Sequence, residues 1–129
     1  HLGLTPQSVH EFGGWRLQGK TRSAAERLLE GARVLQEAGC YAIVLEGIPQ
    51  GLAGQVTEAL HVPTIGIGAG PECSGQVLVL YDLLGLDDRF NPKFLKKYDD
   101  LNSRVVNAVG AYAAEVREEQ FPAAAHSRG

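Results

Sequence analysis

An acidic side chain closes a short apolar run, YAIVLEGIP at residues 41–49. Ile43, Val44 and Leu45 favour a buried strand, and a glycine follows directly after Glu46. If the run is a strand of an α/β barrel, its last residue lies at the face where such barrels keep their chemistry. Glu46 is therefore a candidate catalytic residue, although a solvated glutamate at a strand-to-loop junction is the simpler interpretation.

The alternation of side chains along a strand predicts where Glu46 points. Ala42, Val44 and Glu46 share one face of the strand, whereas Ile43 and Leu45 share the other. The larger side chains suit contact with surrounding helices, and the smaller ones suit a crowded barrel interior. Glu46 is thus predicted to point toward the barrel axis. Burial there raises the pKa of a carboxyl group unless a metal or a cation lies close, which makes it a usable base near neutral pH.

A glycine-rich run, TIGIGAG, occupies residues 64–70. It does not match a dinucleotide-binding fingerprint, because a pattern starting at Gly66 needs glycine where the chain has Pro71. Ile65 and Ile67 point one way and the glycines leave the other face bare. Glycine in a strand often marks the close approach of a ligand or of another backbone. Packing alone is the simpler explanation for any one of these glycines.

Composition excludes several classes of function. With 44% apolar and 21% charged residues, the chain is ordinary for a globular protein, and its net charge of -3 gives no basic footprint for nucleic acid or an anionic membrane. No apolar segment approaches the roughly 20 residues that span a bilayer. The two cysteines lack metal-ligand spacing, so reduced thiols in a cytoplasmic protein are expected. The histidines also lack it and are interpreted as surface or loop residues: His1, His10, His61 and His126.

The elements that would position these residues follow from periodicity and from capping signals. The first helix is predicted to start at a Ser23 N-cap and to stop at Gly39. Strands are predicted at residues 41–45, 64–67 and 77–80, and further helices at residues 52–60, 93–98 and 101–119. Strands joined by helices imply parallel pairing through right-handed crossovers. This content amounts to about half of a (β/α)8 barrel, since whole barrels need about 250 residues. The chain also lacks methionine, and we expect it to be a piece of a longer protein.

Several long motifs occur in fixed order along the chain: HLGLTPQSV, GGWRLQGK, VLEGIP, PTIGIGAGPECSGQVLV, PKFLKKY and a final FP…HS pattern. Together they resemble the ketopantoate hydroxymethyltransferase family over essentially the whole chain. The resemblance implies an α/β fold, a (β/α)8 TIM barrel of the phosphoenolpyruvate/pyruvate superfamily type. Residues 1–129 would be the C-terminal half of that single barrel domain.

The resemblance implies a one-carbon transferase of pantothenate biosynthesis. A hydroxymethyl group passes from 5,10-methylenetetrahydrofolate to 3-methyl-2-oxobutanoate, which gives 2-dehydropantoate. The proton acceptor of the family falls on Glu46, which would remove a proton from C3 of the keto acid. A family histidine near the substrate falls on His1, which would bind or orient the keto acid.

The resemblance also implies parts that this sequence does not supply. A magnesium ion that chelates the keto acid stabilises the enolate, and its ligands belong, with a substrate-binding lysine, to the N-terminal half of the family. No residue of this chain is assigned as a metal ligand. The family further implies a homo-oligomer, a decamer. The chain alone is predicted to be inactive and to fold poorly without the rest of the barrel.

Two other functions remain open at this point. The first is another metal-dependent lyase or mutase of the same superfamily that acts on a keto acid. The combination of LTPQ with IGIGAG…GQVLV favours the hydroxymethyltransferase over it. The second is a non-catalytic half-barrel that serves as an assembly module, and the presence of Glu46 argues against that reading.

Overall fold

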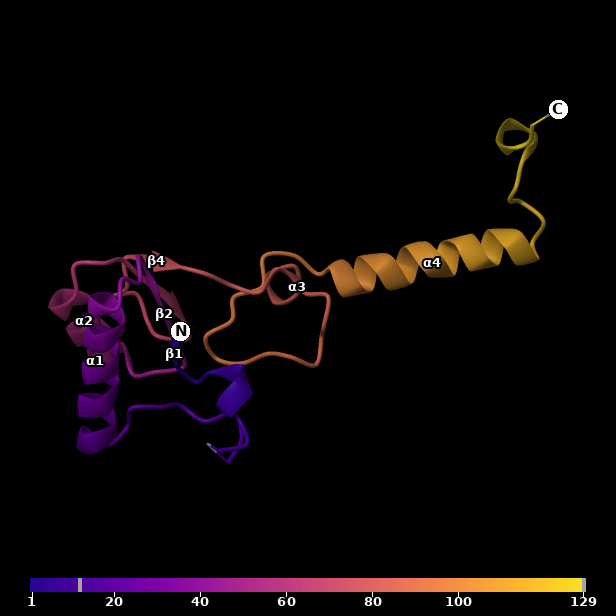
Figure 1. Cartoon of the computed structure of the whole chain (residues 1–129). Helices are drawn as coiled ribbons and strands as arrows, with labels where there is room; N and C mark the ends of the chain where they lie inside the picture. The colour runs from indigo at the N-terminus through magenta and orange to yellow at the C-terminus, as the bar shows by residue number, and fades with distance from the viewer. Residues whose placement is uncertain (12, 129) are drawn as a thin grey trace. The chain divides into compact units, whose positions relative to one another are not determined.

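The chain forms two compact units, His1–Leu78 and Val79–Gly129, in a computed structural model that describes residues 1–11 and 13–128 (Figure 1). The first unit carries a four-stranded sheet in the order β1-β2-β3-β4, with every neighbouring pair parallel. Its strands are β1 (Leu2–Gly3), β2 (Ile43–Glu46), β3 (Thr64–Ile67) and β4 (Gly75–Gln76), and its helices are η1 (Pro6–Ser8), α1 (Arg22–Glu37) and α2 (Gln50–Ala59). The second unit carries α3 (Leu80–Leu83), α4 (Leu101–Arg117) and η2 (Ala124–His126).

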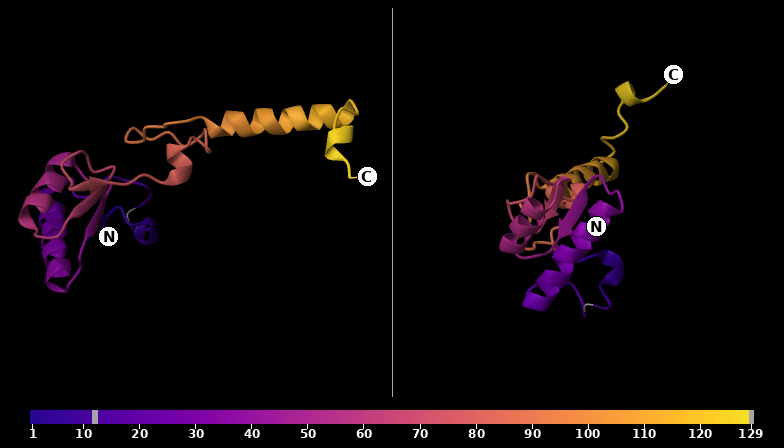
Figure 2. Two further views of the ribbon diagram at one scale, coloured as in Figure 1. Left: turned by 90° about the horizontal axis from the view of Figure 1, so that it is seen from above. Right: turned by 60° about the vertical axis from the view of Figure 1, so that its left-hand side comes forward.

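The strand order follows the chain order, and α1 and α2 lie on one side of the sheet (Figures 1 and 2). Each parallel strand lies beside the strand that precedes it in the chain, so the sheet grows in one direction without a reversal of strand order. The predicted α/β class with parallel pairing is therefore confirmed. The closed barrel stays a prediction, because the four described strands form an open sheet.

The core of the first unit lies between the sheet and these two helices. Ile43 and Leu45 are 1% and 0% exposed, and they pack with Ala32 of α1 and Val56 of α2. The alternate residues of β2, Val44 and Glu46, are only partly buried. The larger side chains thus face the helices, as the alternation predicted.

The first helix begins two residues earlier than its sequence signal suggested. Its N-cap is Thr21, whose Oγ1 accepts a hydrogen bond from the backbone N–H of Ala24 at 3.2 Å, while Ser23 lies within the first turn. Either hydroxyl could have filled this role, and the prediction chose the wrong one. The predicted stop is confirmed, since Gly39 follows the C-cap residue with a φ of 93° that favours glycine.

Two predicted elements are wrong. The residues predicted as a strand at 77–80 instead lead from β4 into α3, and Val77 and Val79 are 45% and 52% exposed. Their β-branched composition resembles a buried strand, but no core covers them. Residues 93–98 form no helix: a turn at residues 93–94 is followed by irregular chain. There Tyr98 donates its backbone N–H to the carbonyl of Leu83 at 2.8 Å, a long-range bond in place of a helical one.

The long final helix is confirmed, although it ends earlier than predicted. Asp100 caps it by accepting a hydrogen bond from the Ser103 backbone N–H at 3.2 Å, and the helix ends at Arg117. No residue of α4 is buried. No helix in the described part of the chain combines the length and apolar character that a bilayer span requires.

Candidate active site

Glu46 is the last residue of β2 and lies at the carboxyl edge of the parallel sheet. In register it stands between Gly3 of β1 and Ile67 of β3. Residues directly opposite one another in a sheet share a face, so the Glu46 side chain lies on the face that the helices leave open. This edge is where parallel α/β proteins assemble their binding sites.

An imidazole reaches this carboxylate from the neighbouring strand. His1 Nε2 lies 3.0 Å from Glu46 Oε2, and the two side chains are 33% and 22% exposed. His1 precedes β1 directly, and Leu2 packs against the core on the helix side. Alternation therefore turns His1 toward the open face. The two residues singled out by the sequence are in direct contact.

Burial raises the pKa of the Glu46 carboxyl above its usual value, because removal from water penalises the charged form. The direction matches the sequence-based expectation. A carboxylic acid with a raised pKa is a stronger base once it is ionised, which suits it to take a proton from carbon. Glu46 thus has the position and the acid–base character of a general base.

Three segments fix the backbone at the exit of β2. The Glu46 carbonyl accepts a hydrogen bond from Leu4 N–H at 2.8 Å, and the next residue, Gly47, donates its N–H to the carbonyl of Ile67 at 2.9 Å. The Gly47 carbonyl in turn accepts from Gln18 N–H at 2.8 Å. Sequence reasoning missed Leu4 and Gln18, because loop-to-strand backbone bonds leave no periodic signal. The backbone at Glu46 and Gly47 is therefore hydrogen-bonded to β3 and to two loop segments.

Gly3 is the strand partner of Glu46, and it has a φ of 94° that disfavours any L side chain. A Cβ there would overlap the carbonyl oxygen of Glu46 and lie 2.8 Å from Cγ2 of Ile48. We therefore expect Gly3→Ala to lower the free energy of unfolding of the full-length protein by more than about 2 kcal/mol, because strain and overlap add. Denaturant titration measures this change.

The matched control for Gly3→Ala is Gly51→Ala in α2. A Cβ added at Gly51 would meet no heavy atom within 4 Å among the described residues, apart from its chain neighbours and the backbone of its own helix. We expect this variant to unfold at least as late as wild type, since alanine favours the helix. Equal unfolding midpoints for Gly3→Ala and wild type would show that β1 accommodates a side chain beside Glu46.

Gly66 of the glycine-rich run packs against the chain's own loop. Ile65 and Ile67 lie on the open face beside Val44 and Glu46, as the register shows. Gly66 points to the opposite face, where a Cβ would lie 2.9 Å from Sγ of Cys73. The close approach at this glycine is therefore made by the chain's own loop, which is the simpler of the two interpretations.

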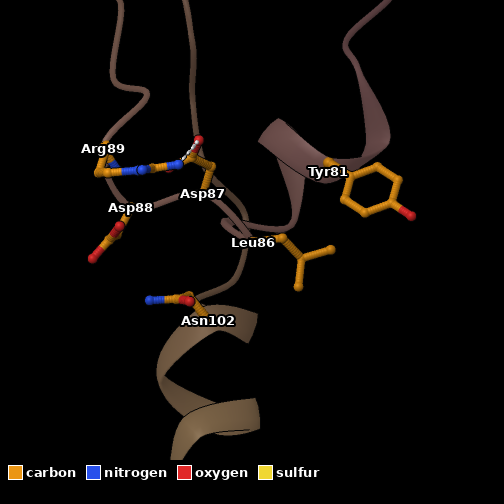
Figure 3. A pocket seen from close by; sticks show the side chains of 6 residues that line it. All are labelled: Tyr81, Leu86, Asp87, Asp88, Arg89 and Asn102. Carbon is orange, nitrogen blue, oxygen red and sulfur yellow. Dashed lines mark hydrogen bonds and ion pairs between the residues drawn. The ribbon is translucent and has the colours of Figure 1, made fainter.

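Neither a metal-ligand cluster nor the pocket found among the described residues lies at Glu46. Among the described residues, no group of three or more histidine, cysteine, aspartate or glutamate side chains could hold a metal ion. A pocket of about 410 Å³ lies in the second unit (Figure 3). Its lining comprises Tyr81, Leu86, Asp87, Asp88, Arg89 and Asn102. The guanidinium of Arg89 is already bonded to both carboxylate oxygens of Asp87, at 3.1 and 3.3 Å, and no residue of the Glu46 unit contributes to this pocket.

Fold and site together define a parallel α/β protein with a carboxylate–imidazole pair at the carboxyl edge of its sheet. The sequence model of the ketopantoate hydroxymethyltransferase family matches residues 1–124. This chain belongs to the ketopantoate hydroxymethyltransferase family.

Curated relatives carry the same family's enzyme name. The 3-methyl-2-oxobutanoate hydroxymethyltransferase of Syntrophobacter fumaroxidans is 58% identical over 129 residues, which cover 100% of this chain and 46% of that protein. The protein of the same name from Geobacter metallireducens is 54% identical over 127 residues, which cover 98% of this chain and 48% of that protein. The chain thus spans less than half the length of these relatives.

Proposed function

We propose that the protein to which this chain belongs transfers a hydroxymethyl group from 5,10-methylenetetrahydrofolate to 3-methyl-2-oxobutanoate and forms 2-dehydropantoate. The names of its relatives support the activity. The observation that carries it to this chain is the partly buried carboxylate of Glu46, which meets His1 at the carboxyl edge of the sheet. We further propose that residues 1–129 form the C-terminal half of a single (β/α)8 barrel of the phosphoenolpyruvate/pyruvate superfamily type. The singly wound parallel sheet supports this architecture.

In this proposal Glu46 is the base that starts the reaction. Its ionised carboxylate takes the proton from C3 of the keto acid, and the electron pair of that C–H bond passes into the enolate. The enolate carbon then forms a bond to the one-carbon unit, the bonds of that unit to the folate nitrogens break, and water supplies the hydroxyl oxygen, so that tetrahydrofolate leaves. Val44, Ile65 and Ile67 supply apolar walls on the same face of the sheet, which suits the branched alkyl group of the substrate. His1 borders the same space and, as the resemblance implies, would bind or orient the keto acid.

The residues of this chain do not fit a magnesium ion. Magnesium prefers an octahedral set of oxygen ligands, whereas the Glu46 neighbourhood offers one carboxylate that is in contact with an imidazole. Elsewhere in the described residues, no group of three or more histidine, cysteine, aspartate or glutamate side chains could hold a metal ion. If the family's metal takes part, its ligands and the substrate lysine would come from a segment that precedes His1. In this proposal the residues of this chain therefore remove the proton and orient the substrate.

The remaining parts of the proposal rest on the resemblance. We propose a cytoplasmic homo-oligomer, a decamer in this family, that acts on small molecules. Neither nucleic acid nor membrane is proposed as a partner. The net charge of -3 supports the absence of a nucleic-acid partner.

The proposed function is tested by an assay of the purified full-length protein with 3-methyl-2-oxobutanoate, 5,10-methylenetetrahydrofolate and magnesium. We expect 2-dehydropantoate to form only when both organic substrates are present. Matched reactions without folate serve as the control, because a lyase or a mutase would convert a keto acid without it. Folate-independent conversion, or no product at all, would overturn the proposal.

A further inference from the structure

We propose that His1 is a positioning residue for Glu46: its Nε2–H donates to Oε2 and leaves Oε1 free to take the substrate proton. This inference rests on the proposed function. It differs from the role that the resemblance implies, because His1 would act through Glu46 rather than on the keto acid.

The first support is the contact itself. Nε2 of His1 and Oε2 of Glu46 lie 3.0 Å apart, which is hydrogen-bond distance. A neutral imidazole carries its proton on one nitrogen and can donate it to a carboxylate. In this proposal the two carboxylate oxygens are therefore distinct: Oε2 is held by His1, and Oε1 takes the substrate proton.

The second support is the space between the two side chains. Gly3 stands directly opposite Glu46 in register and has no side chain to separate the carboxylate from His1. On the other flank, Ile67 is apolar and offers no competing donor. An imidazole one position before β1 can therefore reach diagonally to the end of β2. The strand register builds this pair from residues 45 positions apart.

The third support concerns charge. Burial is the cause that raises the pKa of Glu46. The strand neighbours of Glu46 are Gly3 on the β1 side, with His1 beyond it, and Ile67 on the β3 side, while α1 and α2 pack on the opposite face. A hydrogen bond to the ionised form opposes the effect of burial. His1 lies within reach to donate such a bond, which in this proposal keeps the partly buried carboxylate ionised.

The test uses the full-length protein with two substitutions at His1. His1→Leu removes the donor but keeps an apolar side chain of similar bulk, and His1→Gln places an amide N–H close to the position of Nε2. We expect His1→Leu to lower kcat/KM about 10- to 100-fold, as for the loss of a hydrogen bond to a charged group. In the kcat/KM–pH profile of His1→Leu, the acidic limb should move to higher pH, because loss of the donor raises the pKa of the Glu46 carboxyl. His1→Gln should restore most of both quantities.

A second measurement needs no activity. The protonated carboxyl of Glu46 is followed by infrared spectroscopy of the substrate-free protein across pH, and its band is assigned by its loss in Glu46→Gln. We expect the titration midpoint to rise by about one pH unit in His1→Leu. The titration midpoint should stay near the wild-type value in His1→Gln. It should also stay there in the matched control His61→Gln, because His61 is an exposed residue. His1→Ala replaces His1→Leu if the latter does not fold.

The outcomes separate the possible failures. An unchanged infrared midpoint in His1→Leu overturns the inference, and so does a defect confined to KM with an unshifted pH profile, which would make His1 a substrate ligand only. If the wild-type protein forms no 2-dehydropantoate, the proposed function fails. The infrared titration still decides whether His1 sets the protonation of Glu46.

Discussion

Glu46→Gln in the full-length protein is expected to lower kcat for 2-dehydropantoate formation by roughly 10²- to 10⁴-fold, the usual contribution of a general base. Glutamine has nearly the same shape as glutamate, and its carbonyl can accept the same hydrogen bond from His1. It cannot accept a proton from carbon. The substitution therefore removes the base and leaves the β1–β2 edge in place, so the keto acid should bind about as tightly as before.

The measurement pairs steady-state assays with equilibrium binding of 3-methyl-2-oxobutanoate. Glu58→Gln is the matched control, because Glu58 is an exposed residue on α2 and its helix packs on the far side of the sheet. It should turn over at the wild-type rate. A Glu46→Gln protein that retains wild-type turnover would remove Glu46 from the mechanism, and one that loses substrate binding would give it a binding role instead.

Much of the first unit could be read from local sequence. The strand at residues 64–67 was predicted with its observed bounds, and β2 differs from the predicted strand by a shift at each end. Both strands are short apolar runs bounded by glycine or proline, and the core buries one face of each. The run at residues 77–80 has a similar composition, but Val77, Val79 and Leu80 are exposed. Composition alone does not distinguish a buried strand from an exposed apolar segment.

The site was predictable only in part, for a physical reason. Glu46 stands out locally, because an acid ends an apolar strand. Its contact with His1 depends on which residue of β1 lies opposite which residue of β2, and register is a long-range property. The bonds from Leu4 and Gln18 to the exit of β2 depend on loop paths, which periodicity does not describe. Sequence thus singled out Glu46 as a candidate base, and the structure supplied its surroundings.

The isolated 129-residue chain, assayed with both substrates and magnesium, is expected to form no detectable 2-dehydropantoate. The open face of its sheet carries Val44, Ile65 and Glu46, none of them fully buried. A base on an uncovered face meets water in place of a shaped cavity, which weakens every electrostatic interaction with the substrate. The described residues also provide no set of metal ligands.

Complementation turns this negative expectation into a positive test. A separately produced segment that corresponds to the preceding part of the full-length protein is mixed with the chain, and turnover should appear only in the mixture. The chain that carries Glu46→Gln is the matched control, since it keeps the same surface for association but lacks the base. Turnover by the isolated chain would mean that the residues around Glu46 and His1 suffice for catalysis. Turnover in the Glu46→Gln mixture would instead place the base in the other segment. Product that depends on both pieces and on Glu46 would show that the carboxyl edge of this sheet forms half of a shared site.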